Sequence, residues 1–388
     1  MSGVHAQDEP VRVLIAPDKF KGSLSAARVA RAIGAGLAAA GAHVHELPLA
    51  DGGDGSIEAA VAAGFERVAI QLTGGRSADL ALQRSSATAV VEVAGTCGLS
   101  TPEAGLPALR RSSQAVGTAV LRAQELGARR IVLALGGSST TDGGIGFLHA
   151  LGARFLDERG VVLAPTAASL PLVREVDPCG MVQLRGSELV LATDVDNPLC
   201  GPRGAAAVFG PQKGLSGQQL SSTEAGLRHF VHTLTGAGWA RAADLAAFPG
   251  AGAAGGLGWA GMLLGGRQTS GAQYFLDLLG FEEAVAGCDV VITGEGRLDA
   301  QTAGGKLPQA VAARSAPRPV IAVVGRCDVP VEDLHRLGIS QVHSISQLAG
   351  RDTATEPVIT LQVLHEVGAR LAQDLAHPSA SAQPVLTS

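Results

Sequence analysis

Five polar loops carry the residues of this 388-residue sequence that could do chemistry. Each loop follows an apolar run typical of a buried strand, and the loops cover residues 18–23, 51–55, 136–144, 194–199 and 294–302. They combine glycines with Ser, Thr, Asp, Glu and Lys. Glycines with Ser or Thr at the start of a helix expose N–H groups that bind phosphate, and carboxylates can hold Mg²⁺ or accept a proton. The inventory suits phosphoryl transfer.

Structural alternatives exist for every loop. An Asp-Gly-Gly or Gly-Glu-Gly at a strand end can be a tight turn, although five such loops are poorly explained by turns alone. Asp142 could cap the helix that it precedes. Asp194, ahead of an Asn-Pro pair, could form an Asx turn.

Lysine is rare in this sequence. Four of the 30 basic residues are Lys and the other 26 are Arg, and the four are Lys19, Lys21, Lys213 and Lys306. In a chain that prefers Arg, a retained Lys suggests a place where a compact ammonium is needed, for instance on a phosphate.

Known nucleotide-binding motifs are missing or out of context. No G-x-x-x-x-G-K-[ST] occurs, which excludes a P-loop. Residues 250–255 match G-x-G-x-x-G but follow residues 245–249, which do not form a clean strand and end in Pro. An NAD-dependent dehydrogenase remains a weak alternative that binding of NADH would support.

The loops need a scaffold of strands and helices to position them. A strand–helix rhythm runs through residues 11–63, with strands at 11–16 and 43–49 and helices at 23–40 and 56–63. Short strands at 67–73, 81–84 and 88–93 without helices between them predict antiparallel pairing. Further on we expect helices at 115–126, 145–152 and 216–238 and strands at 130–135 and 189–193. The rhythm then returns, with strands at 289–293, 319–324 and 341–345 and helices at 305–315, 331–337 and 356–376.

Because both ends of the chain share a pattern that the middle lacks, we predict two α/β domains. Residues 1–64 and 281–388 would form a Rossmann- or flavodoxin-like domain with a doubly wound parallel sheet. Residues 65–280 would form an inserted α/β domain with a mixed sheet. We expect the active site in the cleft between the two domains.

Composition narrows the class of partner and the compartment. The formal charge is −5, charged residues make up 17%, and no Lys/Arg cluster occurs, so we expect neither nucleic acid nor an anionic membrane as a partner. The N-terminus does not resemble a secretory signal, and no window has 18 consecutive apolar residues. Five widely spaced cysteines without C-x-x-C read as reduced thiols. We therefore predict a cytoplasmic protein, and its oligomeric state stays open.

Long ordered blocks of this sequence resemble the bacterial glycerate kinase family, of the type that makes 2-phosphoglycerate. The blocks contain all four lysines. One departure is Ser139 and Thr141, where members often have Ala and Asn. The blocks are APDKFKGSLSA (16–26), ADGGDG (50–55), GGSSTTDGG (136–144), TDVDNPLCGPRGAAAVFGPQKG (193–214), PGAGAAGGLG (249–258) and VVITGEGRLDAQTAGGK (290–306).

The resemblance implies a two-domain kinase that uses ATP and Mg²⁺ to phosphorylate D-glycerate. Asp194 would be the base that takes the hydroxyl proton, with Asp299 as second choice. Arg297 would clamp the transition state or pair with Asp299. Three lysines, Lys21, Lys213 and Lys306, would bind phosphoryl oxygens or the substrate carboxylate. The expected Mg²⁺ ligands are Asp51, Asp54 and Glu295. The expected ATP-binding residues are Gly136, Gly137, Ser138, Asp142, Gly294 and Gly296. The expected glycerate-binding residues are Asp18, Lys19, Asn197 and Gln301.

Other readings remain at this point. A non-catalytic sensor of a small acid or nucleotide would bind ligand without ATP turnover, although the many loop carboxylates argue against it. The position of the acceptor hydroxyl within the site decides between a 2-kinase and a 3-kinase. Family resemblance favours O2.

Overall fold

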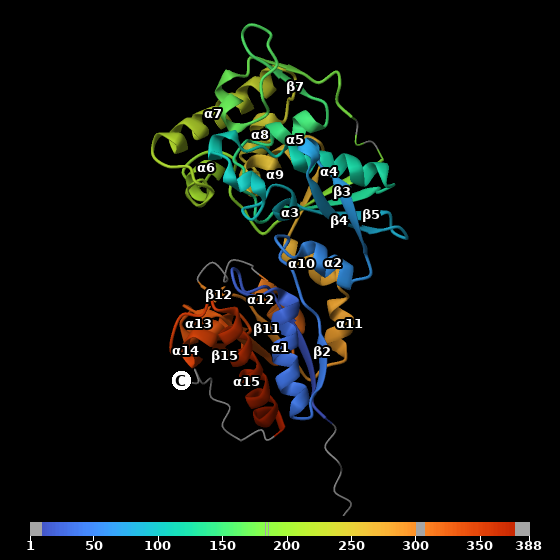
Figure 1. Cartoon of the computed structure of the whole chain (residues 1–388), viewed down its shortest axis with the longest axis vertical. Coiled ribbons are helices and arrows are strands. Elements are labelled where there is room, and N and C mark those ends of the chain that lie inside the picture. The colour runs from blue at the N-terminus through green and yellow to red at the C-terminus, as the bar shows by residue number, and fades with distance from the viewer. Residues whose placement is uncertain (1–9, 183, 185, 300–306, 377–388) are drawn as a thin grey trace, which may run out of the picture. The chain divides into compact units, whose positions relative to one another are not determined.

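A computed structural model describes residues 10–182, 184, 186–299 and 307–376. The chain divides into two compact units (Figure 1). Unit 1 takes the chain up to Ala50 and from Phe275 onward, and unit 2 is the continuous stretch Asp51–Tyr274. Within the described residues, no helix is both long enough and apolar enough to cross a membrane.

Unit 1 is built on a parallel sheet with the strand order β15-β13-β11-β1-β2. In sequence terms this is the 2-1-3-4-5 order of flavodoxin-like folds, and every neighbouring pair is parallel. The predicted doubly wound sheet is therefore confirmed. The strands are β1 (Arg12–Pro17), β2 (His43–Glu46), β11 (Val290–Gly294), β13 (Val320–Val324) and β15 (Gln341–Ser344).

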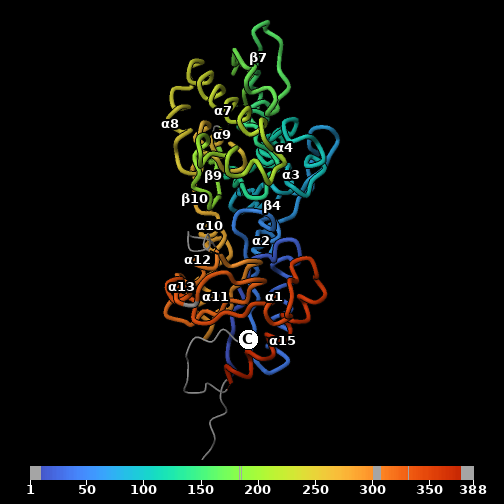
Figure 2. The backbone as a smooth tube through the Cα atoms, turned by 90° about the vertical axis from the view of Figure 1, so that its left-hand side faces the viewer, coloured from blue at the N-terminus to red at the C-terminus, as the bar shows by residue number. Residues whose placement is uncertain are grey.

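Helices cover both faces of the unit 1 sheet. Figure 2 shows α1 and α15 on one side and α11, α12 and α13 on the other. α1 and α15 cross closely, because a Cβ on Gly36 would lie 2.1 Å from the His365 carbonyl oxygen. The helices are α1 (Ala26–Ala39), α11 (Phe281–Ala286), α12 (Leu307–Ser315), α13 (Val331–Arg336), α14 (Ile345–Leu348) and α15 (Pro357–Ala376).

A small parallel pair follows the ends of β11 and β13. β12 (Arg297–Leu298) lies beside β14 (Arg326–Cys327), with Arg297 in register with Arg326. The pair continues the chain directly beyond the carboxyl ends of two neighbouring strands, so it positions any side chain that it carries near that edge of the sheet.

Unit 2 contains a mixed sheet with the order β10-β9-β6-β5-β4-β3. The β3–β4 and β4–β5 pairs are antiparallel, and β5, β6, β9 and β10 run parallel. This confirms the predicted mixed sheet. The strands are β3 (Glu66–Gln71), β4 (Ser77–Gln83), β5 (Thr88–Glu92), β6 (Arg130–Ala134), β9 (Glu188–Ala192) and β10 (Arg267–Thr269). A separate antiparallel pair is formed by β7 (Arg154–Leu156) and β8 (Glu175–Asp177).

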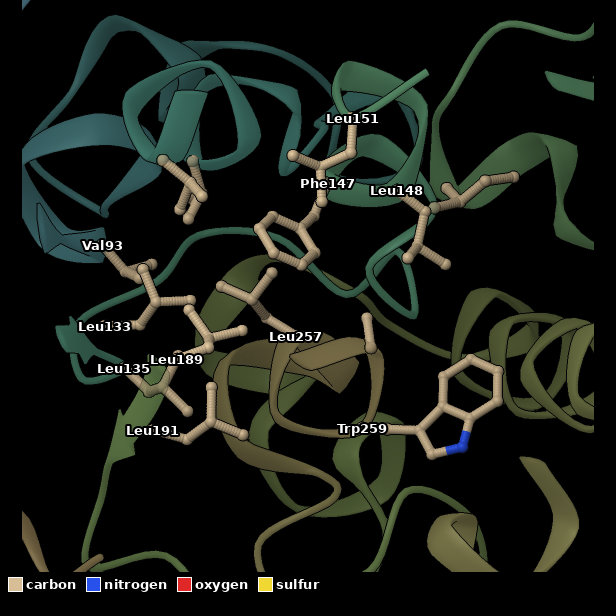
Figure 3. Packing of buried hydrophobic residues seen from close by; sticks show 14 of the residues in the cluster. Val93, Leu133, Leu135, Phe147, Leu148, Leu151, Leu189, Leu191, Leu257 and Trp259 are labelled. Carbon is tan, nitrogen blue, oxygen red and sulfur yellow. The ribbon is translucent and has the colours of Figure 1, made fainter. Parts of the chain in front are cut away.

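The core of unit 2 lies between its sheet and its helices. Figure 3 shows Leu133 and Leu191 of the sheet near Phe147 and Leu257 from the helices. Trp259 is fully buried, and its indole N–H donates to the Ala242 carbonyl at 2.9 Å. The helices are α2 (Ser56–Ala62), α3 (Val93–Cys97), α4 (Gln114–Glu125), α5 (Ile145–Ala150), α6 (Ala205–Phe209), α7 (Gln218–Gly236), α8 (Ala242–Ala246), α9 (Leu257–Leu263) and α10 (Gly271–Leu278).

The unit boundaries fall at Ala50/Asp51 and Tyr274/Phe275, whereas the sequence placed domain boundaries after residues 64 and 280. The first difference arises because α2 packs on β3, β4 and β5 of unit 2. A strand–helix rhythm shows that α2 follows β2, but it does not show on which sheet the helix packs. α10 begins in unit 2 and ends in unit 1.

Candidate active site

The parallel strands of unit 2 end in four polar segments along one edge of the sheet. β5 ends in Glu92, β6 leads into the loop 135–144, β9 leads into Asp194, and β10 leads into Ser270. Parallel strands direct their carboxyl ends to the same edge, where α/β sheets bind ligands. The edge therefore gathers polar groups that are far apart in the sequence.

A fifth segment, the loop 51–55, is held against this edge by backbone contacts. The Gly136 N–H donates to the Gly52 carbonyl at 2.9 Å. A Cβ on Gly136 would lie 2.6 Å from Gly53 Cα, and one on Gly271 would lie 2.2 Å from the Asp51 carbonyl oxygen. Only glycine fits at such distances, so these glycines let Asp51 approach the strand ends.

Asp194, the predicted base, has donors on both carboxylate oxygens. The Ser270 hydroxyl donates to Oδ1 at 2.6 Å, and the Ala272 N–H donates to Oδ2 at 3.1 Å. Desolvation raises the pKa of Asp194, repulsion from Asp51 raises it further, and these hydrogen bonds oppose the rise. Asp194 thus contacts the start of α10 rather than closing a local Asx turn. A raised pKa suits a general base.

Glu92 is a buried carboxylate that the sequence reasoning did not identify. It is 5% exposed, and its Oε2 accepts the N–H groups of Gly55 at 3.0 Å and Ile57 at 3.1 Å. Desolvation raises the pKa of Glu92 to about 7, with smaller contributions from the charges of Glu58 and Asp54. Glu92 ties β5 to the loop that carries Asp54. A single Glu at the end of a strand gives no sequence signal for such a role.

Asp142 lies inside the glycine-rich loop and is fully buried. Its oxygens accept the N–H and hydroxyl of Ser113, both at 2.8 Å, and the N–H groups of Gly144 at 3.1 Å and Gly146 at 3.3 Å. Burial raises the pKa of Asp142, and these four hydrogen bonds oppose the rise. These hydrogen bonds fit the capping alternative, in which Asp142 shapes the loop, and its expected contact with ATP stays a prediction.

Lys213 is buried beneath the same loop, at 4% exposed. Its Nζ donates to the Ser138 hydroxyl oxygen at 2.8 Å and to the Thr140 carbonyl at 2.7 Å. Desolvation lowers the pKa of Lys213 to about 8, and the charge of Arg111 lowers it further. Lys213 thus contacts the loop, and its expected contact with phosphoryl oxygens stays a prediction.

Arg111 is a second buried cation at this place. It donates to the carbonyl oxygens of Lys213 at 2.6 Å and Ser139 at 3.3 Å, and also to those of Ala104 and Leu106. It therefore fixes the chain around Lys213 with hydrogen bonds to backbone oxygens. The sequence reasoning missed Arg111, because one Arg among 26 is not distinctive.

The G-x-G-x-x-G run at residues 250–255 follows helix α8 and not a strand. A Cβ on Gly255 would lie 2.1 Å from the Thr140 carbonyl oxygen, and one on Gly252 would lie 2.4 Å from the Pro198 carbonyl oxygen. These glycines pack against two polar loops of the edge. The strand context that a dinucleotide site needs is absent, so the dehydrogenase alternative loses its support.

In unit 1, polar residues follow β1 and β11, the two strands between which the strand order reverses. Asp18 and Lys19 follow β1, Gly294 ends β11 and Glu295 follows it. The Asp18 N–H donates to the Gly294 carbonyl at 2.7 Å, and Lys19 Nζ lies 3.5 Å from Asp18 Oδ1. Such switch points are where doubly wound sheets bind ligands.

The neighbouring residues Gly296 and Lys21 belong to the same region of unit 1. A Cβ on Gly296 would lie 3.1 Å from the Lys21 backbone nitrogen, which makes Gly296 a close-packing position.

Arg297 pairs with Asp328. Its Nε lies 2.6 Å from Asp328 Oδ2, and Arg326 Nε lies 2.7 Å from Asp328 Oδ1. The hydrogen bonds from Arg326 and Arg297 lower the pKa of Asp328. β12 and β14 lie side by side, which brings Arg297 near Asp328, and spacing along the chain does not show this arrangement. The expected roles of Arg297 at the transition state or beside Asp299 stay predictions.

Three expected contacts remain to be placed. Asn197 donates from Nδ2 to the Arg203 carbonyl at 2.7 Å, so its amide holds its own loop. Gln301 and Lys306 lie outside the described residues.

Asp51 and Asp54 belong to unit 2 and Glu295 to unit 1. Within the described part of the chain, no group of three or more His, Cys, Asp or Glu side chains could hold a metal ion. Mg²⁺ bound with a nucleotide usually takes one or two carboxylates, with phosphate and water oxygens as its other ligands. The carboxylates of Asp51 and Asp54 fit that donor chemistry, and Oδ1 of Asp51 also accepts the Gly53 N–H at 3.0 Å.

The fold and the polar residues at the carboxyl edges of the two sheets define an α/β enzyme. Its polar groups lie at the ends of parallel strands. Comparison with known proteins identifies the family of the chain. The sequence model described as the Glycerate kinase family matches residues 13–373. The chain belongs to the glycerate kinase family, and it is therefore a kinase. The predictions of family, kinase activity and α/β fold are confirmed.

Individual relatives agree with this family assignment. A Glycerate kinase of Bacillus subtilis (strain 168) is 38% identical over 347 residues, which cover 86% of this chain and 90% of the relative. A Glycerate 2-kinase of Escherichia coli (strain K12) is 38% identical over 348 residues, with the same coverage. A crystal structure from Salmonella typhimurium LT2, provisionally assigned as a glycerate kinase 2, is 33% identical with a TM-score of 0.76. That match covers 94% of this chain and 98% of the Salmonella chain.

Proposed function

We propose that this kinase transfers the γ-phosphoryl group of ATP to O2 of D-glycerate and yields 2-phosphoglycerate. The observation that carries the proposal is the family match along residues 13–373, together with the E. coli relative that is named a glycerate 2-kinase. The polar edge of unit 2 supports it, since it offers a carboxylate base beside a glycine-rich loop.

In this proposal the acceptor hydroxyl oxygen attacks the γ-phosphorus, the bond from that phosphorus to the ADP oxygen breaks, and the hydroxyl proton passes to Asp194. Ser270 and the Ala272 N–H hold the Asp194 carboxylate in one orientation. The raised pKa of Asp194 makes it a better proton acceptor than an ordinary Asp. Asp299 remains the second candidate for this role.

Phosphoryl transfer depends mainly on positioning and on electrostatic stabilisation of the transferred group. In unit 2 the loop 136–144 lies over the buried cations Lys213 and Arg111. In unit 1, Lys19 and Lys21 lie in the loop after β1. We propose that these groups offset the negative charge of ATP and glycerate.

Mg²⁺ would be held by Asp51 and Asp54, with Glu295 as a further candidate. When bound, the ion neutralises charge on the phosphate oxygens. The role of this chain's own residues is to place those carboxylates, and Glu92 and Gly136 do so by fixing the loop 51–55.

The test is incubation of the purified protein with D-glycerate, ATP and Mg²⁺, with a no-acceptor control, followed by ³¹P NMR of the products. A 2-phosphoglycerate signal is expected. A 3-phosphoglycerate signal would keep the kinase and overturn the assignment of O2. Intact ATP in a folded sample would contradict the proposed acceptor and support the non-catalytic sensor.

Two further statements stay predictions, namely that the protein is cytoplasmic and that its partners are small molecules only. They rest on the composition and on the substrates that the family acts upon.

A further inference from the structure

We infer that the Ser138 hydroxyl donates a hydrogen bond to an anionic oxygen of the bound ligand, and that Lys213 is the positioning residue that directs it. The anionic oxygen belongs to a phosphoryl group of the nucleotide or to the glycerate carboxylate. The inference deepens the proposed function and rests on it, because it assigns a ligand contact at the same edge of unit 2.

The first argument is the direction of one hydrogen bond. An ammonium group has only donors, so Lys213 must donate to the Ser138 oxygen across their 2.8 Å contact. One lone pair of the hydroxyl is thus occupied, and its O–H remains to be donated elsewhere. Within the described part of the chain, no acceptor is bonded to that O–H. The hydroxyl is therefore oriented as a donor without an internal acceptor.

The neighbouring hydroxyl shows the contrast. Ser139 donates its O–H to the Cys97 carbonyl at 2.7 Å, so its donor is used inside the protein. Two adjacent buried serines thus differ in whether the O–H donor is already used inside the protein, and Ser138 alone of the two accepts a hydrogen bond from Lys213. This difference makes Ser139 the matched control for Ser138.

The second argument is the charge beneath the loop. Lys213 and Arg111 are both buried, and their hydrogen bonds go mainly to backbone carbonyl oxygens of this region. No carboxylate forms an ion pair with either of them among the described residues. Asp142 is the buried carboxylate nearby, and its oxygens accept four hydrogen bonds from the loop and Ser113. The uncompensated positive charge favours an anion on the loop.

A third observation comes from the next two residues. The hydroxyls of Thr140 and Thr141 are buried without a hydrogen-bond partner in the described structure, and both residues are at most 3% exposed. Buried polar groups rarely stay unpaired in native proteins. The loop therefore offers polar groups that a ligand or a bound water can satisfy.

Binding measurements on Ser138→Ala test the donor role. We would measure Kd by calorimetry for a non-hydrolysable ATP analogue with Mg²⁺ and, separately, for D-glycerate. A hydrogen bond to a charged group predicts that one of the two ligands binds about 10- to 100-fold more weakly. The affected ligand identifies which anionic oxygen is met. Ser139→Ala should leave both Kd values unchanged, although it loses the bond to Cys97.

A double-mutant cycle tests the positioning role of Lys213. If Lys213 acts through Ser138, Lys213→Met costs clearly less affinity when Ser138 is already Ala than it does in the wild-type background, and the remaining loss measures the effect of the charge alone. A direct contact between Lys213 and the ligand would instead make the two losses add. Additive losses would overturn the positioning role, and unchanged binding by Ser138→Ala would overturn the whole inference.

If Lys213→Met does not fold, the pH dependence of Kd decides. Burial lowers the pKa of Lys213 to about 8, with Arg111, Asp142 and Cys97 facing it, so the ammonium loses its proton above that pH. Ligand affinity of the wild type should then fall between pH 7 and 9, and Ser138→Ala should show a clearly smaller fall. Equal pH profiles would contradict the positioning role.

Failure of this inference differs from failure of the proposed function. If D-glycerate is phosphorylated and Ser138→Ala binds both ligands normally, only the inference is wrong. If D-glycerate is not turned over but Ser138→Ala still loses nucleotide affinity, the acceptor is wrong and the contact stands.

Discussion

Two hydrogen bonds give the Asp194 carboxylate one orientation at the carboxyl edge of the unit 2 sheet. Ser270 follows β10 and Ala272 lies in the first turn of α10, so the junction after the neighbouring strand supplies both donors. A carboxylate held in this way can accept a proton without first having to reorient. Its pKa is raised by desolvation and by Asp51, which strengthens it as a base.

Replacement of Asp194 by Asn should lower kcat by about 10²–10⁴-fold, because the amide cannot accept the hydroxyl proton. Steady-state kinetics with D-glycerate and ATP measure this loss. Asp196→Asn is the control, since Asp196 lies in the same loop, is exposed and pairs at 3.5 Å with Arg203. Turnover above about a tenth of wild type in Asp194→Asn would exclude Asp194 as the base, and Asp299→Asn would then be examined in the same way.

Glu92 makes a second prediction at the scale of one residue, and here the sign follows from proton linkage. Its folded pKa of about 7 lies above the ordinary value of 4.5, so the native state holds a proton that the unfolded state has lost between these pH values. The free energy of unfolding therefore contains a penalty that grows as pH rises from 4.5 to 7 and is complete above 7.

Glu92→Gln removes that penalty, and the amide oxygen can still accept the N–H groups of Gly55 and Ile57. We compare the free energy of unfolding of the variant with that of the wild type at each pH. This difference should favour the variant by roughly 1–3 kcal/mol more at pH 8 than at pH 5. Urea unfolding at the two pH values measures the gain. Glu66→Gln is the control, because Glu66 is exposed, pairs with Arg84 and does not contribute to the pKa of Glu92. If the difference in the free energy of unfolding between Glu92→Gln and wild type is the same at pH 5 and pH 8, the raised pKa of Glu92 is refuted as its cause.

At the scale of elements, loops meet through glycine contacts. Gly136→Ala places a Cβ 2.6 Å from Gly53 Cα, where backbone atoms must move to make room. We expect a stability loss of about 1–3 kcal/mol and a lower kcat, because the loop that carries Asp51 is displaced. Gly236→Ala in α7 is the control, since its Cβ would meet nothing within 4 Å, and it should be neutral or stabilising by up to about 1 kcal/mol. Wild-type stability and kcat in Gly136→Ala would show that the close contact is not needed.

The element pattern also shows what the sequence could and could not predict. Strand–helix alternation predicted the parallel sheet, and short strands without helices between them predicted the antiparallel part of the mixed sheet, because apolar periodicity and turn residues are local signals. Tertiary contacts decide whether α2 packs on the first or the second sheet. They also decide the burial and the hydrogen-bond partners of Lys213 and Glu92. The sequence predicted Lys213 as a ligand of phosphoryl oxygens or of the substrate carboxylate, and only the fold shows that it is buried beside Arg111 and the glycine-rich loop. Motif blocks thus located the segments of the site more reliably than the partner of each side chain.

At the scale of the whole molecule, the way the chain runs through the two units allows a test of whether unit 2 folds without unit 1. Unit 2 is one continuous stretch that contains every strand of its sheet and its own apolar core, including Phe147, Phe230 and Trp259. Unit 1 is formed from both ends of the chain, and it holds Lys19, Lys21 and Glu295. Unit 2 therefore meets the requirements of a domain that folds alone.

We expect an excised fragment of residues 51–274 to unfold in a single cooperative transition, measured by circular dichroism during heating. A mixed sheet covered by helices and closed around one core has no need of residues from unit 1. The same fragment should not phosphorylate D-glycerate, because Lys19 and Lys21 are absent and the charge of ATP is met in part by them under the proposed function. A fragment without a cooperative transition would show that the core of unit 2 depends on unit 1. A folded fragment with wild-type turnover would show instead that the loops after β1 and β11 take no part in the reaction.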